Sequence, residues 1–159
     1  MDKLYTRTGD GGMTSAGGAR LAKNSPLIEL IGTVDELSAA LLWACAALEG
    51  AILRDTRRLE RICFAVMCEL AGGGKIDADA LPYELEQMCD RAGGGALSEF
   101  LTFTSEAATR LNLARTVARR AERCAVSVAC EIRPEILCVL NRSSDAIFAL
   151  ARAAEKGAL

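Results

Sequence analysis

The stretch PLIELIGTVDELSAALLWACAAL, residues 26–48, carries a strong periodic signal. Its large apolar residues recur every three or four positions, at Leu27, Leu30, Ile31, Val34, Leu37, Leu41, Cys45 and Leu48. This spacing places them on one face of an α-helix, because the helix turns once in about 3.6 residues. Ser25 followed by Pro26 is typical of a helix N-terminus, so we expect a long helix that begins at Pro26 with Ser25 as its cap.

Similar patterns predict four more helices, separated by glycine runs at 72–74 and 93–95. Their expected ranges are about 53–71, a shorter helix at 80–91, a long helix capped by Thr104 or Ser105 that runs to about 130, and a last helix at about 134–156. No strand pattern competes, and residues 1–24 have the composition of an extended, glycine-rich loop. We predict an all-α protein, a five-helix antiparallel bundle of four long helices and one short one, forming a single domain over residues 1–159.

Composition argues against several classes of protein. The chain has 159 residues, of which 51% are hydrophobic and 25% charged, values that suit a globular domain with its own core. A net charge of −2 argues against a general nucleic-acid binder, so any anion site must be local. The most apolar stretch is too short to span a bilayer, and the N-terminus lacks the apolar core of a signal peptide. We expect a soluble cytoplasmic protein.

The chain contains seven cysteines and no histidine. The cysteines are scattered without a C-x-x-C pair, so we expect neither a disulfide framework nor a zinc site and interpret most of them as small apolar residues on helix faces. The lack of histidine removes the commonest general base and the Ser-His and Cys-His nucleophile pairs. Any chemistry at this protein must proceed without imidazole.

Charged residues form a pattern on the fourth predicted helix. Arg115, Arg119 and Arg123 recur every four residues and line one stripe. Such a stripe is either a solvated surface or a site for a polyanion, which arginine binds through paired donors. Asp35 on the first helix and Asp145 on the last are either surface carboxylates or partners that orient one of these arginines.

The N-terminal segment YTRTGDGG, residues 5–12, combines three glycines with threonine hydroxyls. Successive glycines allow backbone N–H groups to converge on an anion, and Thr6, Thr8 and Thr14 add hydroxyl donors. We expect φ > 0 and a close approach of the backbone to phosphate at Gly9, which would exclude a β-branched residue there. Together with the arginine stripe, this loop indicates a site for a phosphate chain.

Four segments, in this order, resemble the propanediol-utilisation (PduO) type of ATP:cob(I)alamin adenosyltransferase. They are YTRTGDGG at 5–12, K-x-x-P at 23–26 leading into GTVDEL at 32–37, ARTVARRAER at 114–123 and LNRSSDAIFALAR at 140–152. The resemblance implies a five-helix bundle that assembles as a homotrimer, with each site at a subunit interface. It implies transfer of the 5′-deoxyadenosyl group of ATP to the cobalt of cob(I)alamin, with Mg²⁺ required, adenosylcobalamin formed and triphosphate released.

The resemblance also implies roles for individual residues. The implied ATP-binding residues are Thr6, Arg7, Thr8, Gly9, Thr14, Ser15 and Lys23 near the N-terminus, and Arg119, Arg120, Glu122, Arg123 and Asn141 on the helices. Asp35 is implied to pair with Arg119 across subunits. Phe100 is implied to displace the lower axial ligand of cob(II)alamin and so ease its reduction. Because Co(I) is itself the nucleophile, the absence of histidine is no obstacle.

Two positions depart from the family pattern. Gly11 stands where the family usually has a lysine, and LTFTSE at 101–106 replaces ILPGG, which makes Phe103 an alternative to Phe100. The alternative function is therefore a catalytically impaired ATP-binding trimer that acts as a corrinoid carrier or regulatory subunit; a purely structural bundle is a third reading. The partners implied for an active enzyme are an electron donor and an adenosylcobalamin-dependent enzyme. No metal ligands are assigned.

Overall fold

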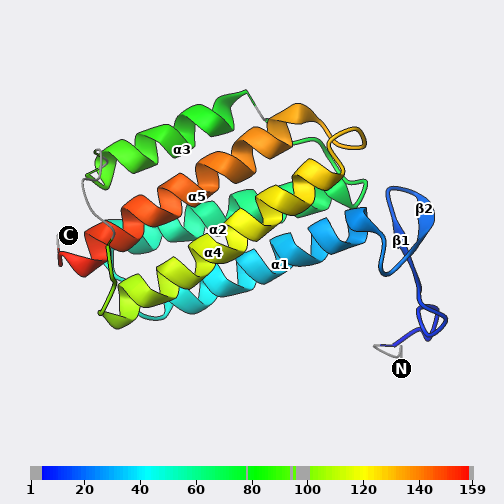
Figure 1. Ribbon diagram of the computed structural model, residues 1–159, viewed down its shortest axis with the longest axis horizontal. Coiled ribbons are helices and arrows are strands. Elements are labelled where there is room, and N and C mark those ends of the chain that lie inside the picture. Colours follow the sequence, from blue (N-terminus) through cyan, green and yellow to red (C-terminus); the bar gives the residue numbers. More distant parts are fainter. Residues whose placement is uncertain (1–4, 78, 94, 96–100, 158–159) are drawn as a thin grey trace.

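Five helices make up most of the computed structural model, which describes residues 5–77, 79–93, 95 and 101–157 (Figure 1). They are α1 (Pro26–Cys45), α2 (Gly50–Leu70), α3 (Ala80–Arg91), α4 (Glu106–Ser127) and α5 (Pro134–Glu155). The predicted all-α bundle of four long helices and one short helix is confirmed.

The four long helices form the bundle and α3 covers one side of it. Helix α1 packs against α2 and α4, and α5 packs against α4, α2 and α3. Long helices that pack together run in opposite directions, whereas α3 runs in the same direction as α5 (Figure 1). The predicted antiparallel arrangement is therefore that of the four long helices.

The core combines large residues from α1 with small residues from α4. Leu30, Val34, Leu37 and Leu41 of α1 are completely buried, as the apolar periodicity predicts. The buried residues of α4 include four alanines at helical spacing, Ala114, Ala118, Ala121 and Ala125. Because alanine is small, α1 and α5 can approach α4 closely. The long polar side chains of α4 are left on its opposite face.

The two predicted helix caps have different outcomes. The hydroxyl of Ser105 accepts a hydrogen bond from the Ala108 N–H at 3.3 Å and caps α4 as expected. The hydroxyl of Ser25 makes no capping bond and is buried without a partner among the described residues, so this part of the prediction was wrong. Pro26 still begins α1, because its ring presets φ and it has no N–H group to satisfy.

The N-terminal segment contains a β-hairpin that the sequence analysis did not predict. Strand β1 (Met13–Ala16) pairs antiparallel with β2 (Ala19–Ala22). Gly17 and Gly18 form the turn with φ of 59° and 76°, as a type I′ turn requires. The expectation that no strand occurs was wrong, because strands of four residues are too short to show a clear alternation. The Gly-Gly pair was the available signal.

The cysteines differ in environment. Cys63 is buried in the core, where loss of solvation raises the pKa of its thiol to about 12. Cys45, Cys68, Cys89 and Cys124 are half-buried, which agrees with the interpretation of most cysteines as small apolar residues; Cys130 and Cys138 are exposed. Among the described residues, no helix combines the length and apolar character needed to cross a membrane.

Candidate functional site

The arginines predicted to share one stripe of α4 occupy two environments. Arg119 and Arg123 are exposed, and no described residue forms an ion pair or hydrogen bond with either guanidinium. Arg115 is half-buried: its Nε donates to Oδ1 of Asn112 at 2.9 Å, and its guanidinium lies 5.7 Å from the centre of the Phe148 ring. The stripe therefore offers two free cations, while Arg115 belongs to the packing between α4 and α5.

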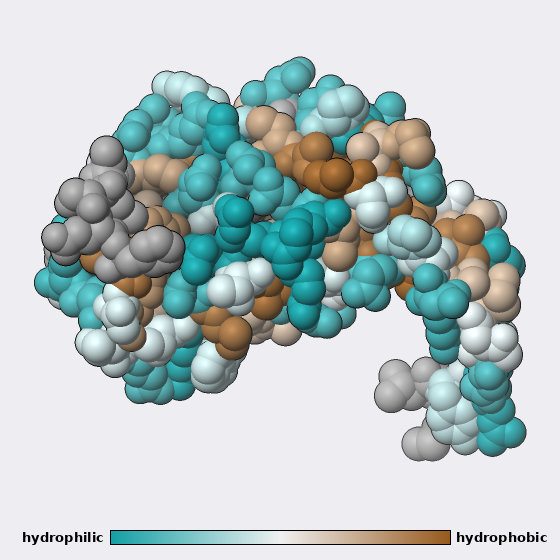
Figure 2. Space-filling view, in the orientation of Figure 1, coloured by the Kyte–Doolittle hydropathy of each residue, from teal (hydrophilic) through white to brown (hydrophobic). Residues whose placement is uncertain are grey.

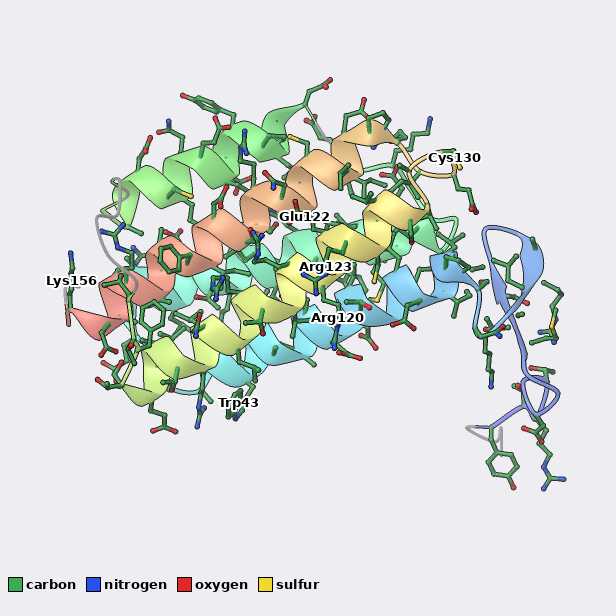
Figure 3. All side chains as sticks on the ribbon, in the orientation of Figure 1. Trp43, Arg120, Glu122, Arg123, Cys130 and Lys156 are labelled. Atoms are coloured by element: carbon green, nitrogen blue, oxygen red, sulfur yellow. The ribbon has the colours of Figure 1, made fainter. Side chains whose placement is uncertain are left out.

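Two further charged residues of the prediction, Arg120 of α4 and Asp35 of α1, differ in their partners. Arg120 forms an ion pair with Glu36 of α1, and Figure 3 shows Arg120 directed towards that helix. Asp35, next to Glu36, is exposed and has no ion-pair partner among the described residues. Within one chain, Asp35 and Arg119 form no ion pair or hydrogen bond with each other. Both are thus available to a group from outside the chain.

Glu122 of α4, labelled in Figure 3, is hydrogen-bonded to Asn141 of α5. Nδ2 of Asn141 donates to Oε1 of Glu122 at 2.8 Å, and Oδ1 of Asn141 accepts from Nη1 of Arg142, also at 2.8 Å. Nε of Arg142 donates to Oε1 of Glu86 on α3 at 2.8 Å. Three helices therefore hold the Asn141 amide in one orientation next to the free arginines. Figure 2 shows a hydrophilic band across this face.

The N-terminal loop is joined to the hairpin by the side chain of Arg20. Nη2 of Arg20 donates to the carbonyl of Thr8 at 2.9 Å, and its Nη1 donates to the hydroxyl of Ser15 at 3.4 Å. The hydroxyls of Thr6 and Thr8 lie 2.9 Å apart. Arg20 was missed by the sequence analysis; its signal is its position directly opposite Ser15 in the hairpin.

Lys23 lies over Gly9, but the expected backbone conformation of Gly9 was wrong. A Cβ atom on Gly9 would come 3.0 Å from Nζ of Lys23, yet Gly9 does not have φ > 0. Positive φ occurs instead at Arg7, with 60°, and at Gly12, with 78°. Gly9 is therefore the place where a lysine ammonium approaches the backbone, and the sharp turns lie on either side of it.

The two groups of predicted site residues are not brought together within one chain. The hairpin and the loop before it extend beyond one end of the bundle (Figure 1), away from the part of α4 that carries Arg120 and Arg123 (Figure 3). Thr14 on β1 is half-buried, while Ser15 is exposed. The described residues thus form two separate cationic surfaces. One lies on residues 5–25, here called the N-terminal arm, around Arg20 and Lys23, and the other lies on α4 around Arg119 and Arg123.

Of the two candidate phenylalanines, Phe100 lies outside the described residues. Phe103 is half-buried, and its ring packs edge-to-face against Phe148 with 5.9 Å between ring centres. The guanidinium of Arg115 lies over the same Phe148 ring. Phe103 therefore has a packing role that the sequence analysis did not foresee, because its partner comes from a distant part of the chain.

The chain matches the cobalamin adenosyltransferase family over residues 4–154. It belongs to that family. It is 40% identical to the corrinoid adenosyltransferase PduO of Salmonella typhimurium over 98% of its length, and 36% identical to a corrinoid adenosyltransferase of Citrobacter freundii over the same share. Its fold is similar to a variant PduO-type ATP:corrinoid adenosyltransferase from Lactobacillus reuteri solved with cobalamin and ATP, with a TM-score of 0.88 and 28% identity over 97% of this chain and 94% of that one.

The relatives differ in length. The chain spans 50% of the Salmonella PduO and 96% of the Citrobacter corrinoid adenosyltransferase. The family match over residues 4–154 of this chain runs from the N-terminal segment into α5.

Proposed function

We propose that this chain transfers the 5′-deoxyadenosyl group of ATP to the cobalt of cob(I)alamin, forming adenosylcobalamin and releasing triphosphate. Membership of the family supports the reaction, as do the names of its relatives and the cobalamin and ATP bound to the solved Lactobacillus protein. The observation that carries the proposal is the pair of unpaired arginines, Arg119 and Arg123, next to the oriented Asn141 amide. We further propose that residues 1–159 act as one domain.

The reaction needs charge stabilisation from the protein and no general base. The electron pair of Co(I) forms the bond to C5′ of ATP as the C5′–O bond breaks, and the pair of that bond leaves with triphosphate; no proton is transferred. Arg119 and Arg123 would neutralise the departing charge, with Arg120 and Glu122 completing the same surface. Asn141 would orient the nucleoside through its fixed amide.

The N-terminal arm would hold the phosphate chain. Thr6, Arg7, Thr8 and Gly9 are proposed to contact it with hydroxyl, guanidinium and backbone N–H donors, while Thr14, Ser15 and Lys23 close over it. Lys23 supplies a cation beside the loop although Gly11 replaces the lysine usual in the family. Arg20, which holds the Thr8 carbonyl and Ser15, would keep these donors in place.

We propose that the complete site forms between copies of the chain in a homotrimer. The arm and the α4 surface lie apart in one chain, and each carries groups suited to phosphate. The arm of one copy would reach the α4 surface of its neighbour, with Asp35 of one copy pairing Arg119 of the other. This arrangement explains why both charges are exposed and unpaired in the single chain.

Magnesium is proposed to arrive with the nucleotide. The described residues contain no cluster of three or more carboxylate, cysteine or histidine side chains suited to hold a metal. Mg²⁺ in nucleotide sites is typically held by phosphate oxygens and water with few protein ligands. The protein would therefore bind Mg²⁺ together with ATP.

The test is to mix the protein, MgATP and chemically reduced cobalamin under anaerobic conditions and to follow the visible spectrum for formation of the Co–C bond. We expect adenosylcobalamin and triphosphate to appear in equal amounts. Binding of MgATP without this change would overturn the proposed reaction in favour of the carrier function.

A further inference from the structure

The tip of the hairpin contacts the end of α2. The N–H of Gly17, in the turn, donates to the carbonyl of Ala71 at 2.8 Å. Gly72, which follows α2 with φ of 92°, lies so close that a Cβ atom there would come 2.7 Å from Cα and 3.1 Å from N of Gly17. Only glycine fits at position 72, because both atoms of the clash belong to backbone.

The segment after α2 is itself held in place. The carboxylate of Glu69 accepts hydrogen bonds from Nε and Nη2 of Arg133 at 2.6 and 2.9 Å and from the N–H of Ile76 at 2.7 Å. Nη2 of Arg133 also donates to the carbonyl of Ile76 at 3.0 Å. Glu69 and Ile76, on either side of residues 72–75, are thereby both joined to Arg133 at the start of α5. The hairpin tip therefore contacts a segment that is held at both ends.

The other attachment of the hairpin is its connection to α1. The N–H of Ser25 donates to the carbonyl of Ala22 at 2.9 Å, at the point where β2 leads into the helix. A hairpin held only there could swing about residues 23–25. With the tip held as well, the direction of β1 is set, and so is that of the loop at residues 5–12 that precedes it.

We propose that Gly72 is a positioning residue whose contact with Gly17 aims the N-terminal arm, and that this contact sets the affinity for nucleotide. The inference rests on the proposed function, in which residues 6–9 bind the phosphates of ATP. A preorganised arm loses less conformational freedom on binding than one that swings. Gly72 touches no substrate and acts through Gly17.

The experiment compares Gly72→Ala with Gly93→Ala. Both glycines occupy the same position after a helix and have positive φ, of 92° and 79°, but a Cβ atom on Gly93 meets nothing within 4 Å. The control therefore carries the same backbone strain without the clash. For each variant we would measure hydrogen exchange at the Gly17 amide, the Kd for MgATP alone by calorimetry, and kcat and KM for ATP.

We expect Gly72→Ala to speed exchange at Gly17 and to raise Kd and KM by about tenfold, with kcat changed by less than about twofold. Gly93→Ala should leave all four values near those of the wild type. If Gly72→Ala does not fold, Arg133→Lys replaces it, because lysine keeps the charge but loses the paired hydrogen bonds that hold residues 72–76.

Each contrary result has one meaning. Faster exchange at Gly17 with an unchanged Kd would overturn the inference, because the arm would then be released without any effect on the affinity for MgATP. Unchanged exchange at Gly17 would overturn it also, because Gly72 would then not hold the tip. A wild-type protein that does not bind MgATP would instead overturn the proposed function, and the exchange data would still report on the contact.

Discussion

The side-chain amide of Asn141 on α5 donates a hydrogen bond of 2.8 Å to the carboxylate of Glu122 on α4. This bond links the two helices beside the free arginines, and Arg142 fixes the other end of the amide. The Asn141 amide is thus held in one orientation by two protein side chains. Its remaining hydrogen-bonding capacity therefore points in a fixed direction, in which a ligand could meet it. Substitutions at this pair should therefore affect the site more than the bundle.

Replacing Asn141 by Asp should place two carboxylates in contact and abolish the bond. We expect a loss of about 1–2 kcal/mol in the free energy of unfolding, because the pair is only half-buried, and a larger loss in kcat/KM for ATP. Glu122→Gln in the same background should restore stability, since an amide can donate to the new carboxylate. Urea unfolding and steady-state kinetics measure both. A double variant no more stable than Asn141→Asp would show that the two side chains are not coupled.

Arg119→Ala should remove the principal charge that stabilises departing triphosphate. We expect kcat/KM for ATP to fall by about 10²–10³-fold, with a melting temperature close to that of the wild type because Arg119 is exposed. Asp35→Asn should show a milder defect of the same kind. Arg54→Ala on α2 is the matched control, an exposed arginine with no ion pair among the described residues. Equal kinetics in the two arginine variants would show that the arginine stripe of α4 is only a solvated surface and not a phosphate site.

Gly9→Val should raise KM for ATP by displacing a cation and not by straining the backbone. The new Cβ atom would lie 3.0 Å from Nζ of Lys23, whose flexible side chain can move aside. We therefore expect a normal thermal unfolding curve and a KM at least about fivefold higher, as for the loss of a charge-assisted contact. Lys23→Ala should produce a similar KM by itself. If adding Gly9→Val to Lys23→Ala raises KM again, the valine acts on the loop directly.

Phe100 and Phe103 should give different phenotypes. Phe103 packs on Phe148, so Phe103→Ala should cost about 2–3 kcal/mol of stability and impair turnover from cob(II)alamin and cob(I)alamin alike. Phe100→Ala should reduce turnover that starts from cob(II)alamin with a mild reductant, yet spare turnover from cob(I)alamin supplied ready-made. Parallel assays from the two oxidation states, with urea unfolding, separate these roles. A selective defect in Phe103→Ala alone would transfer the corrinoid role to Phe103.

Glu155 should make the stability of the bundle depend on pH in the acid range. Its carboxylate accepts four hydrogen bonds, from the backbone N–H groups and the hydroxyls of Thr104 and Ser105, and these lower its pKa from 4.5 to about 2. Because the pKa is lower in the folded state, the stabilisation is complete above about pH 5 and disappears as the pH falls towards 2.

Urea unfolding at intervals from about pH 6 to 2 tests this dependence. The loss of stability on acidification should be smaller in Glu155→Gln than in the wild type, whereas Glu131→Gln, at an exposed glutamate, should follow the wild type. Parallel curves for Glu155→Gln and the wild type would show that this carboxylate does not contribute.

The helices could be predicted from the sequence because apolar periodicity is local information, whereas the proposed reaction was implied by the resemblance of four motifs to a known family. Burial of Leu30, Val34 and Leu37 follows from their spacing on α1, since a helix repeats its faces whatever packs against it. The absence of histidine likewise excludes an imidazole base without reference to any fold. The hairpin was within reach through the Gly-Gly pair at its turn and was missed because its strands are short.

Contacts between distant segments were decided only by the tertiary structure. Arg115 and Arg119 are equivalent in the sequence pattern, but the ring of Phe148 on α5 and the amide of Asn112 hold Arg115, while Arg119 stays free. Gly72 and Gly17 are also in contact, although they are far apart in the sequence and no sequence pattern relates them. Periodicity specifies which face of a helix is apolar. It does not specify which side chain of another helix or strand will meet the polar face, because that depends on how the packed elements lie in space.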